Sequence, residues 1–202
     1  MKEMKKRGIW VCVACVAAVL LSCMGGETPT PKPKGYVRID FPEKHYQEYD
    51  TSALPFVFER ADDATVEVKK NERRLKWVDI KYPAYDGVIF LSYIPLRSAG
   101  DLAGEVDTSY KLLSKHFDFS SGIDERVFEN AAERVYATTY RLKGKNVAST
   151  YQFWATDSVG HFLRGSLYID CVPNNDSLAP VLEYLQRDLD HLLETLRWRR
   201  GR

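Results

Sequence analysis

The sequence has little of what marks several large classes of protein. Its 202 residues include only four cysteines and four histidines, and 29 Lys and Arg residues nearly balance 28 Asp and Glu residues. Four cysteines are too few for a disulfide-built scaffold, and the balanced charge argues against a nucleic-acid-binding surface. A hydrophobic content of 45% excludes a disordered chain. No apolar run reaches the roughly 18 residues of a permanent transmembrane helix.

Sequence motifs of catalysis are missing as well. The chain after residue 22 contains no HExxH, P-loop, GxSxG, EF-hand or dinucleotide-binding motif. Cys12 and Cys15 have CxxC spacing, but they lie inside an apolar leader that we expect to be removed. The sequence therefore predicts no catalytic residues, no metal site and no cofactor other than a covalent lipid.

That leader is the first positive feature. Residues 1–22 begin with basic side chains, continue as an apolar run from Gly8 to Leu21, and end with the small Ser22. This order is typical of a secretory signal peptide. Leu20-Leu21-Ser22-Cys23 resembles a bacterial lipobox, which implies cleavage before Cys23, a diacylglyceryl group on its thiol and an acyl chain such as palmitate on its amine. The alternative is an uncleaved anchor with an incidental cysteine.

Residues 23–35 follow as a proline-rich tether. Pro29, Pro31 and Pro33 favour an extended backbone of roughly 3.1 Å per residue, long enough to hold a domain clear of lipid headgroups. By resemblance to known sorting rules, Met24 after the cysteine favours the outer membrane, facing the periplasm. We expect the membrane to be a partner through the lipid alone, because the acyl chains supply the binding free energy.

Residues 36–202 have the size and uniform composition of one globular domain. Period-two alternation and turn residues predict strands over 56–59, 65–69, 75–82, 88–94, 127–130, 134–142, 147–155 and 161–169. Short connections make neighbouring strands antiparallel. Two helices are predicted, one over about 101–117 and one over about 177–196. This order predicts an α+β fold, an antiparallel β-sheet covered by helices, and it is also similar to the PsbP/Mog1-type α/β/α sandwich.

The second helix carries a face of leucines that must pack on the sheet. Asp188, His191 and Glu194 lie on its opposite side, where we expect a solvated surface rather than a metal site. The arginine-rich end from Arg197 to Arg202 is expected to be a solvated tail, with contact to a lipid or a partner as the alternative.

Five residues are candidates for an interaction or ligand site. Asp157, Ser158 and His161 lie in and beside one turn and are the residue types of a hydrolase triad, although a turn rarely supplies triad geometry. The first role of Asp157 is expected to be hydrogen bonding within the turn. Arg164 lies in the next strand, where an ion pair across the sheet is favoured over ligand binding. Asn174 and Asp176 precede the second helix and are expected to satisfy backbone groups.

Several strings of this sequence match one family in combination. They are Pro31-Lys32-Pro33-Lys34-Gly35-Tyr36, Arg38-Ile39-Asp40 with Pro42, Tyr82-Pro83, Lys115-His116, Gln152-Phe153, Thr156-Asp157-Ser158, His161-Phe162-Leu163-Arg164-Gly165, Pro173-Asn174, and Asp176-Ser177-Leu178 with Pro180. In these the chain resembles the gliding motility lipoprotein GldD family. Departures from that family's pattern are Trp154 and Asp170-Cys171.

The resemblance implies a non-enzymatic envelope lipoprotein, a component or assembly factor of the gliding motility and type IX secretion machinery. It implies other envelope proteins of that machinery as partners, with no nucleic acid. Two alternatives stay open. One is a periplasmic ligand-binding or hydrolytic protein that uses the region of Asp157, His161 and Arg164. The other is a lipid or small-ligand carrier with an apolar cavity between the sheet and the helix.

Overall fold

The computed structural model describes residues 39–69 and 76–199. The chain divides into two units, Met1–Val37 and Arg38–Arg202. The predicted signal peptide, the lipidated Cys23 and the tether lie outside the described residues. Within the described ranges, no helix is both long and apolar enough to cross a membrane.

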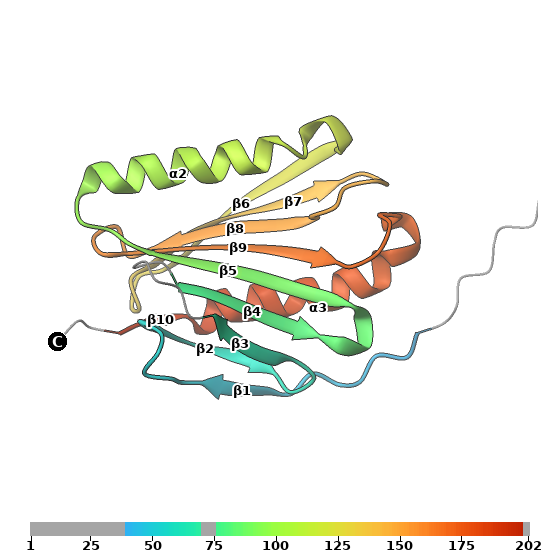
Figure 1. The fold of residues 1–202 in the computed structure, drawn as a ribbon, viewed down its shortest axis with the longest axis horizontal. Coiled ribbons are helices and arrows are strands. Elements are labelled where there is room, and N and C mark those ends of the chain that lie inside the picture. Colours follow the sequence, from blue (N-terminus) through green and yellow to red (C-terminus); the bar gives the residue numbers. More distant parts are fainter. Residues whose placement is uncertain (1–38, 70–75, 200–202) are drawn as a thin grey trace, which may run out of the picture. The chain divides into compact units, whose positions relative to one another are not determined.

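The centre of the fold is a seven-stranded sheet (Figure 1), in which every pair of neighbouring strands is antiparallel. In spatial order the strands are β3 (Thr65–Lys69), β4 (Lys76–Tyr82), β5 (Gly87–Pro95), β9 (His161–Ile169), β8 (Tyr151–Thr156), β7 (Val135–Lys143) and β6 (Gly122–Asn130). Each strand predicted in this sheet is confirmed, β3 and β9 with the predicted bounds and the others with shifted ends. The largest shift is in β6, which begins five residues before its predicted start at Val127.

A second sheet was only partly predicted. It contains β1 (Tyr46–Tyr49), β2 (Phe56–Ala61) and β10 (Arg197–Trp198), with β2 in the middle. Of these strands, only β2 was predicted. The prediction of a solvated tail is wrong for Arg197 and Trp198, because both pair with β2.

The helix α3 (Asn175–Thr195) builds the main core. Its leucines join β2 and one face of the large sheet in a single buried cluster, in which Leu185 and Leu189 have no exposed surface. These leucines fill the space between helix and sheet. They occupy the volume in which a carrier would have its apolar cavity.

The helix α2 (Ala99–Ser114) lies on the opposite face, against β8 and β9. Its N-cap is Ser98, whose hydroxyl accepts the Asp101 N–H. A smaller cluster of Leu113, Leu142 and Val147 holds this layer. Two short 3-10 helices, η1 (Pro83–Tyr85) and η2 (Phe117–Phe119), complete the order of elements. The prediction of an α+β fold with helices covering an antiparallel sheet is confirmed.

The prediction that the polar side of α3 is a solvated surface is wrong for Asp188 and His191. Asp188 is only 4% exposed; it accepts a hydrogen bond from the Lys44 ammonium at 2.6 Å and one from the Tyr46 hydroxyl at 2.9 Å. His191 stacks on Tyr46 and lies 2.7 Å from a carboxylate oxygen of Glu59. The segment around β1 thus covers a surface that we predicted to be solvated. No group of three or more potential metal ligands occurs in the part of the chain that the structure describes.

Candidate functional site

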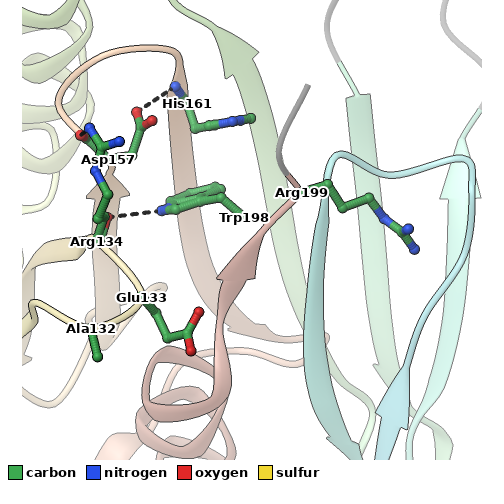
Figure 2. A pocket seen from close by; sticks show the side chains of 7 residues that line it. All are labelled: Ala132, Glu133, Arg134, Asp157, His161, Trp198 and Arg199. Atoms are coloured by element: carbon green, nitrogen blue, oxygen red, sulfur yellow. Dashed lines mark hydrogen bonds between the residues drawn. The ribbon is translucent and has the colours of Figure 1, made fainter. Parts of the chain in front are cut away.

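Asp157 and His161 line one pocket of about 260 Å³ (Figure 2). It lies between the β6–β7 turn, the β8–β9 turn and the end of the chain. The remaining lining residues are Ala132, Glu133, Arg134, Trp198 and Arg199. Three segments that are distant in the sequence therefore meet at this pocket.

Asp157 is committed to its own turn. Its Oδ1 atom accepts hydrogen bonds from the backbone N–H groups of Val159, Gly160 and His161, at 2.9, 2.8 and 2.8 Å. Burial alone raises the pKa of this carboxyl, but the three N–H donors stabilise the charged form, and the net effect is a pKa below the usual value. Asp157 thus makes the hydrogen bonds within its own turn that the sequence predicted.

His161 is held by two aromatic residues. Its ring stacks on Trp198, with ring centres 5.0 Å apart and an angle of 10° between the planes. Its Nδ1 atom lies 2.9 Å from the hydroxyl of Tyr93. Burial lowers the pKa of His161, with Arg134 acting in the same direction and Asp157 opposing it. Burial and the charge of Asp157 raise the pKa of Tyr93 to about 12.

The direction of the hydrogen bond between Tyr93 and His161 depends on the tautomer of the imidazole. In the tautomer in which the Tyr93 hydroxyl donates to Nδ1, the ring proton of a neutral His161 is on Nε2. No hydrogen bond to Nε2 is found among the described residues. In that tautomer Nε2 of His161 offers an N–H donor to the pocket, and in the other tautomer it offers an acceptor.

Arg134 forms the rim opposite His161. Its backbone is in the left-handed region, with φ of 55°, and its carbonyl accepts the Trp198 indole N–H at 3.1 Å. Its guanidinium donates to the Asp157 carbonyl at 3.4 Å. Ser158 in the facing turn also has a positive φ, of 67°. Left-handed non-glycine residues cost free energy and often occur where the backbone has a functional role.

Arg199 contributes less to the pocket than its charge suggests. Its guanidinium pairs with Asp50 and donates to the Thr51 carbonyl at 3.2 Å. Figure 2 shows this side chain pointing away from His161 and Trp198. Arg134 is therefore the cation that faces the pocket.

The pocket does not have the geometry of a Ser-His-Asp triad. A triad needs the serine bonded to one ring nitrogen and the carboxylate to the other. Here Nδ1 of His161 meets a tyrosine, Asp157 bonds to backbone groups, and no hydrogen bond links Ser158 to His161 in the described structure. The arrangement offers hydrogen-bond donors and an aromatic wall, which suit binding of an acceptor group.

Arg164 does not join this pocket. Its position on β9 differs from that of His161 by three residues, so the two side chains leave opposite faces of the sheet. Arg164 is half-buried on the α2 side, where burial lowers the pKa of its guanidinium and Glu105 opposes that shift. The favoured ion pair across the sheet is absent among the described residues. Asp157 and His161 therefore belong to the pocket, and Arg164 lies on the other face of the sheet.

Asn174 and Asp176 are also remote from the pocket, at the start of α3. Asn174 occupies the N-cap position, and its amide donates to the Ser177 hydroxyl at 3.1 Å. Asp176 lines a groove of about 620 Å³ between β7 and α3. Between them, Asn175 donates to the carbonyls of Gly144 and Val147 and ties the helix to the β7–β8 connection.

Sequence reasoning missed Arg134 and Trp198. A signal for Trp198 was available, since a tryptophan within a run of arginines is unusual for a solvated tail. Arg134 carried no such signal. It was predicted as the first residue of a strand and is instead the last residue of a turn.

The comparisons with known proteins bear on the whole chain. No curated protein sequence matches it. Among solved structures, it is similar to the solution structure of cyanobacterial PsbP (CyanoP) from Synechocystis sp. PCC 6803, with 13% sequence identity and a TM-score of 0.47. That match covers 76% of this chain and 92% of the other. PsbP was also named from the order of predicted elements, and nothing about function follows from so distant a likeness.

A family model gives the stronger result. The model described as gliding motility lipoprotein GldD matches residues 26–198, which include the whole pocket except Arg199. The match spans most of the chain and agrees with the strings of residues quoted above. This chain belongs to the gliding motility lipoprotein GldD family.

Proposed function

We propose that this protein is a non-enzymatic component or assembly factor of the gliding motility and type IX secretion machinery, anchored by lipid on Cys23 to the periplasmic face of the outer membrane. The observation that carries the proposal is the family match over residues 26–198 together with the lipobox that ends at Cys23. The first places the chain in a lipoprotein family, and the second supplies the residue that would carry the lipid.

The geometry of the domain supports a binding role more than a catalytic one. Asp157 and the Nδ1 atom of His161 are both engaged in hydrogen bonds that hold the turn and the strand. General acid–base chemistry needs groups free to exchange a proton with a substrate. A tethered domain gains effective concentration near its partners, so that a modest interface is sufficient.

The anchor is tested by substituting its cysteine. We expect the protein purified from native membranes to begin at Cys23 with a mass that includes three acyl chains. Cys23→Ser, expressed at the wild-type level, should lose membrane attachment and fail to complement a deletion strain in gliding and in secretion. Cys171→Ser is the matched control, because this exposed thiol has no partner in the described structure and its loss should leave both activities unchanged. A mature protein that begins elsewhere, or full complementation by Cys23→Ser, would refute the proposal.

A second candidate is that the pocket of His161 binds a small ligand with an acceptor group, such as a carboxylate. The observation that favours it is that His161 and Arg134 line the pocket without a carboxylate partner in the described residues, so that the Arg134 guanidinium, and Nε2 of His161 in the tautomer in which Tyr93 donates, can donate to the ligand. His161→Phe keeps an aromatic ring over Trp198 and removes the donor. Wild-type complementation by the double variant His161→Phe with Arg134→Gln would exclude a ligand function for this pocket.

A further inference from the structure

Strand β6 is an open edge of the large sheet. It has nine residues, Gly122–Asn130, in regular register with β7, and β7 is its only strand neighbour in the described sheet. In Figure 1 it borders the sheet on the side opposite β3. The strand contains no proline and no bulge, two of the features that normally block an edge from pairing. Val127 is 80% exposed and Ile123 is 38% exposed.

The free backbone groups of β6 follow from the pairing of β7. The Leu142 N–H bonds to the Thr150 carbonyl at 2.9 Å, so the even-numbered residues of β7 direct their backbone groups toward β8. Alternate residues of an antiparallel strand bond to alternate sides. The odd-numbered residues of β7 therefore bond to β6, where their partners have even numbers. The odd-numbered residues of β6, among them Ile123, Glu125 and Val127, direct N–H and C=O away from the sheet.

We propose that two copies of this chain associate through β6, antiparallel, with Glu125 opposite Glu125 of the second copy. In this register Ile123 lies opposite Val127 of the second copy, and the reciprocal pair forms on the other side of the two-fold axis. On the other face, Asp124 lies opposite Arg126 of the second copy, again twice. The pairs centred on Glu125, Ile123 and Val127 each exchange two backbone hydrogen bonds.

The side chains of β6 select this register over its neighbours. If one β6 strand slides along the other so that the two-fold axis moves from residue 125 to residue 126, Arg126 lies opposite Arg126 of the second copy and Glu125 lies opposite Val127 of the second copy. If the axis moves on to residue 127, Glu125 lies opposite Glu129 of the second copy. In the proposed register the exposed Ile123 and Val127 meet each other, and each Asp124, which already pairs with Lys143 of its own chain, also meets an Arg126, which has no ion pair in the described structure. The facing Glu125 pair is the one unfavourable contact.

The main contacts of α2 are with β8 and β9 and those of α3 are with β2, so β6 is not a main contact of either helix. Ile123, Glu125 and Val127 are exposed, which leaves these side chains of β6 accessible to a second copy. An interface of one strand per copy is small and gives a weak dimer in dilute solution. Confinement of both copies to one membrane, which rests on the function proposed above, raises their effective concentration.

Cysteine crosslinking of the full-length protein in native membranes tests the register. With Cys171→Ser as background, Glu125→Cys places two thiols on residues whose Cα atoms are about 5.5 Å apart, within disulfide range. Glu129→Cys is the matched control: it lies on the same strand and face, but its counterpart is roughly 26 Å away in the dimer. We expect oxidation to give at least tenfold more disulfide-linked homodimer for Glu125→Cys than for Glu129→Cys.

A charge exchange gives an independent readout. In the Glu125→Cys protein, Asp124→Arg should reduce the yield of homodimer at least threefold, because it faces Arg126 of the second copy. Adding Arg126→Asp reverses both charges and should restore the yield. Recovery in the double variant cannot be explained by a change in folding alone.

Three results overturn the inference. They are equal crosslinking at positions 125 and 129, no homodimer at position 125, and a crosslinked product whose mass shows a different protein, which would instead indicate strand addition by another partner. None of these results bears on the anchor, which is tested separately by the amino-terminal mass at Cys23. The dimer and the proposed function can therefore fail independently.

Discussion

Gly165 is the position at which the packing of the sheet makes the sharpest prediction. A Cβ atom added there would lie 2.0 Å from Cε1 and 2.5 Å from Cζ of Phe153, on the neighbouring strand. Phe153 is 1% exposed and belongs to the buried core cluster, so a shift of its ring would displace other core side chains. Overpacking of a filled core costs about 1–3 kcal/mol, and a contact this short belongs at the upper end of that range. We expect Gly165→Ala to lower the free energy of unfolding by about 3 kcal/mol.

The assay is urea unfolding of the soluble Cys23→Ser chain, followed by circular dichroism. A loss of that size corresponds to a fall in Tm of about 6–12 °C for a domain of this length. Gly104→Ala is the matched control. No atom lies within 4 Å of the added Cβ, and in the interior of α2 alanine should raise stability by about 0.5–1 kcal/mol.

A second substitution identifies the cause of the loss. Phe153→Leu alone should cost about 1 kcal/mol, but in the Gly165→Ala background it removes the clash and should recover stability. The two changes should therefore be non-additive by more than about 1 kcal/mol. A Gly165→Ala protein within 0.5 kcal/mol of the wild type, or strictly additive effects, would refute the packing argument.

Three further predictions concern charged and titrating groups. Lys44→Met leaves Asp188 buried without its cation and should lower the free energy of unfolding by about 3 kcal/mol in the same urea assay. The control is Lys111→Met, which breaks an exposed ion pair with Asp107 and should change the free energy of unfolding by less than about 0.5 kcal/mol. Burial raises the pKa of Asp157, but its hydrogen bonds outweigh burial and lower that pKa, so the charged carboxylate stabilises the folded state. The free energy of unfolding of the wild type should therefore exceed that of Asp157→Asn by its full amount above the unfolded-state pKa of about 3.9, and the difference should shrink as the pH falls further. Urea unfolding at pH 7 and pH 2 tests this, and a difference that is independent of pH would contradict it. Burial lowers the pKa of His161, so its NMR titration should have a midpoint below 6.5, and its contribution to stability should be lost as the pH falls below that value; a midpoint at or above 6.5 would contradict the buried stacking on Trp198.

Local patterns were sufficient for most of the large sheet and for both helices. Strand β9 was predicted with its observed bounds because it is rich in apolar and aromatic residues and follows a turn of Asp157 to Gly160. The predicted leucine face of α3 is the face that packs in the core. The start of β6 was missed because Asp124-Glu125-Arg126 places charges on both faces of an edge strand, which hides the alternation.

The candidate site could be predicted only in part. Asp157 and His161 are four residues apart, and a turn brings them together by local chemistry alone. Trp198 reaches His161 because β10 pairs with β2, a contact between residues far apart in the sequence. Strands as short as β1 and β10 carry too few residues for a periodic signal, and their stability comes from those distant partners.

The sequence by itself was sufficient for the family, the strands of the sheet and the leucine face of the last helix, and the lipobox at Cys23 is a prediction from the same kind of pattern. These depend on the order and spacing of neighbouring residues, which a sequence states directly. Only the tertiary structure decided that Arg164 and His161 lie on opposite faces, that Asp188 is buried beneath Lys44, and that β6 is an open edge. Such properties depend on which segments cover one another, and this is set by the packing of the whole domain.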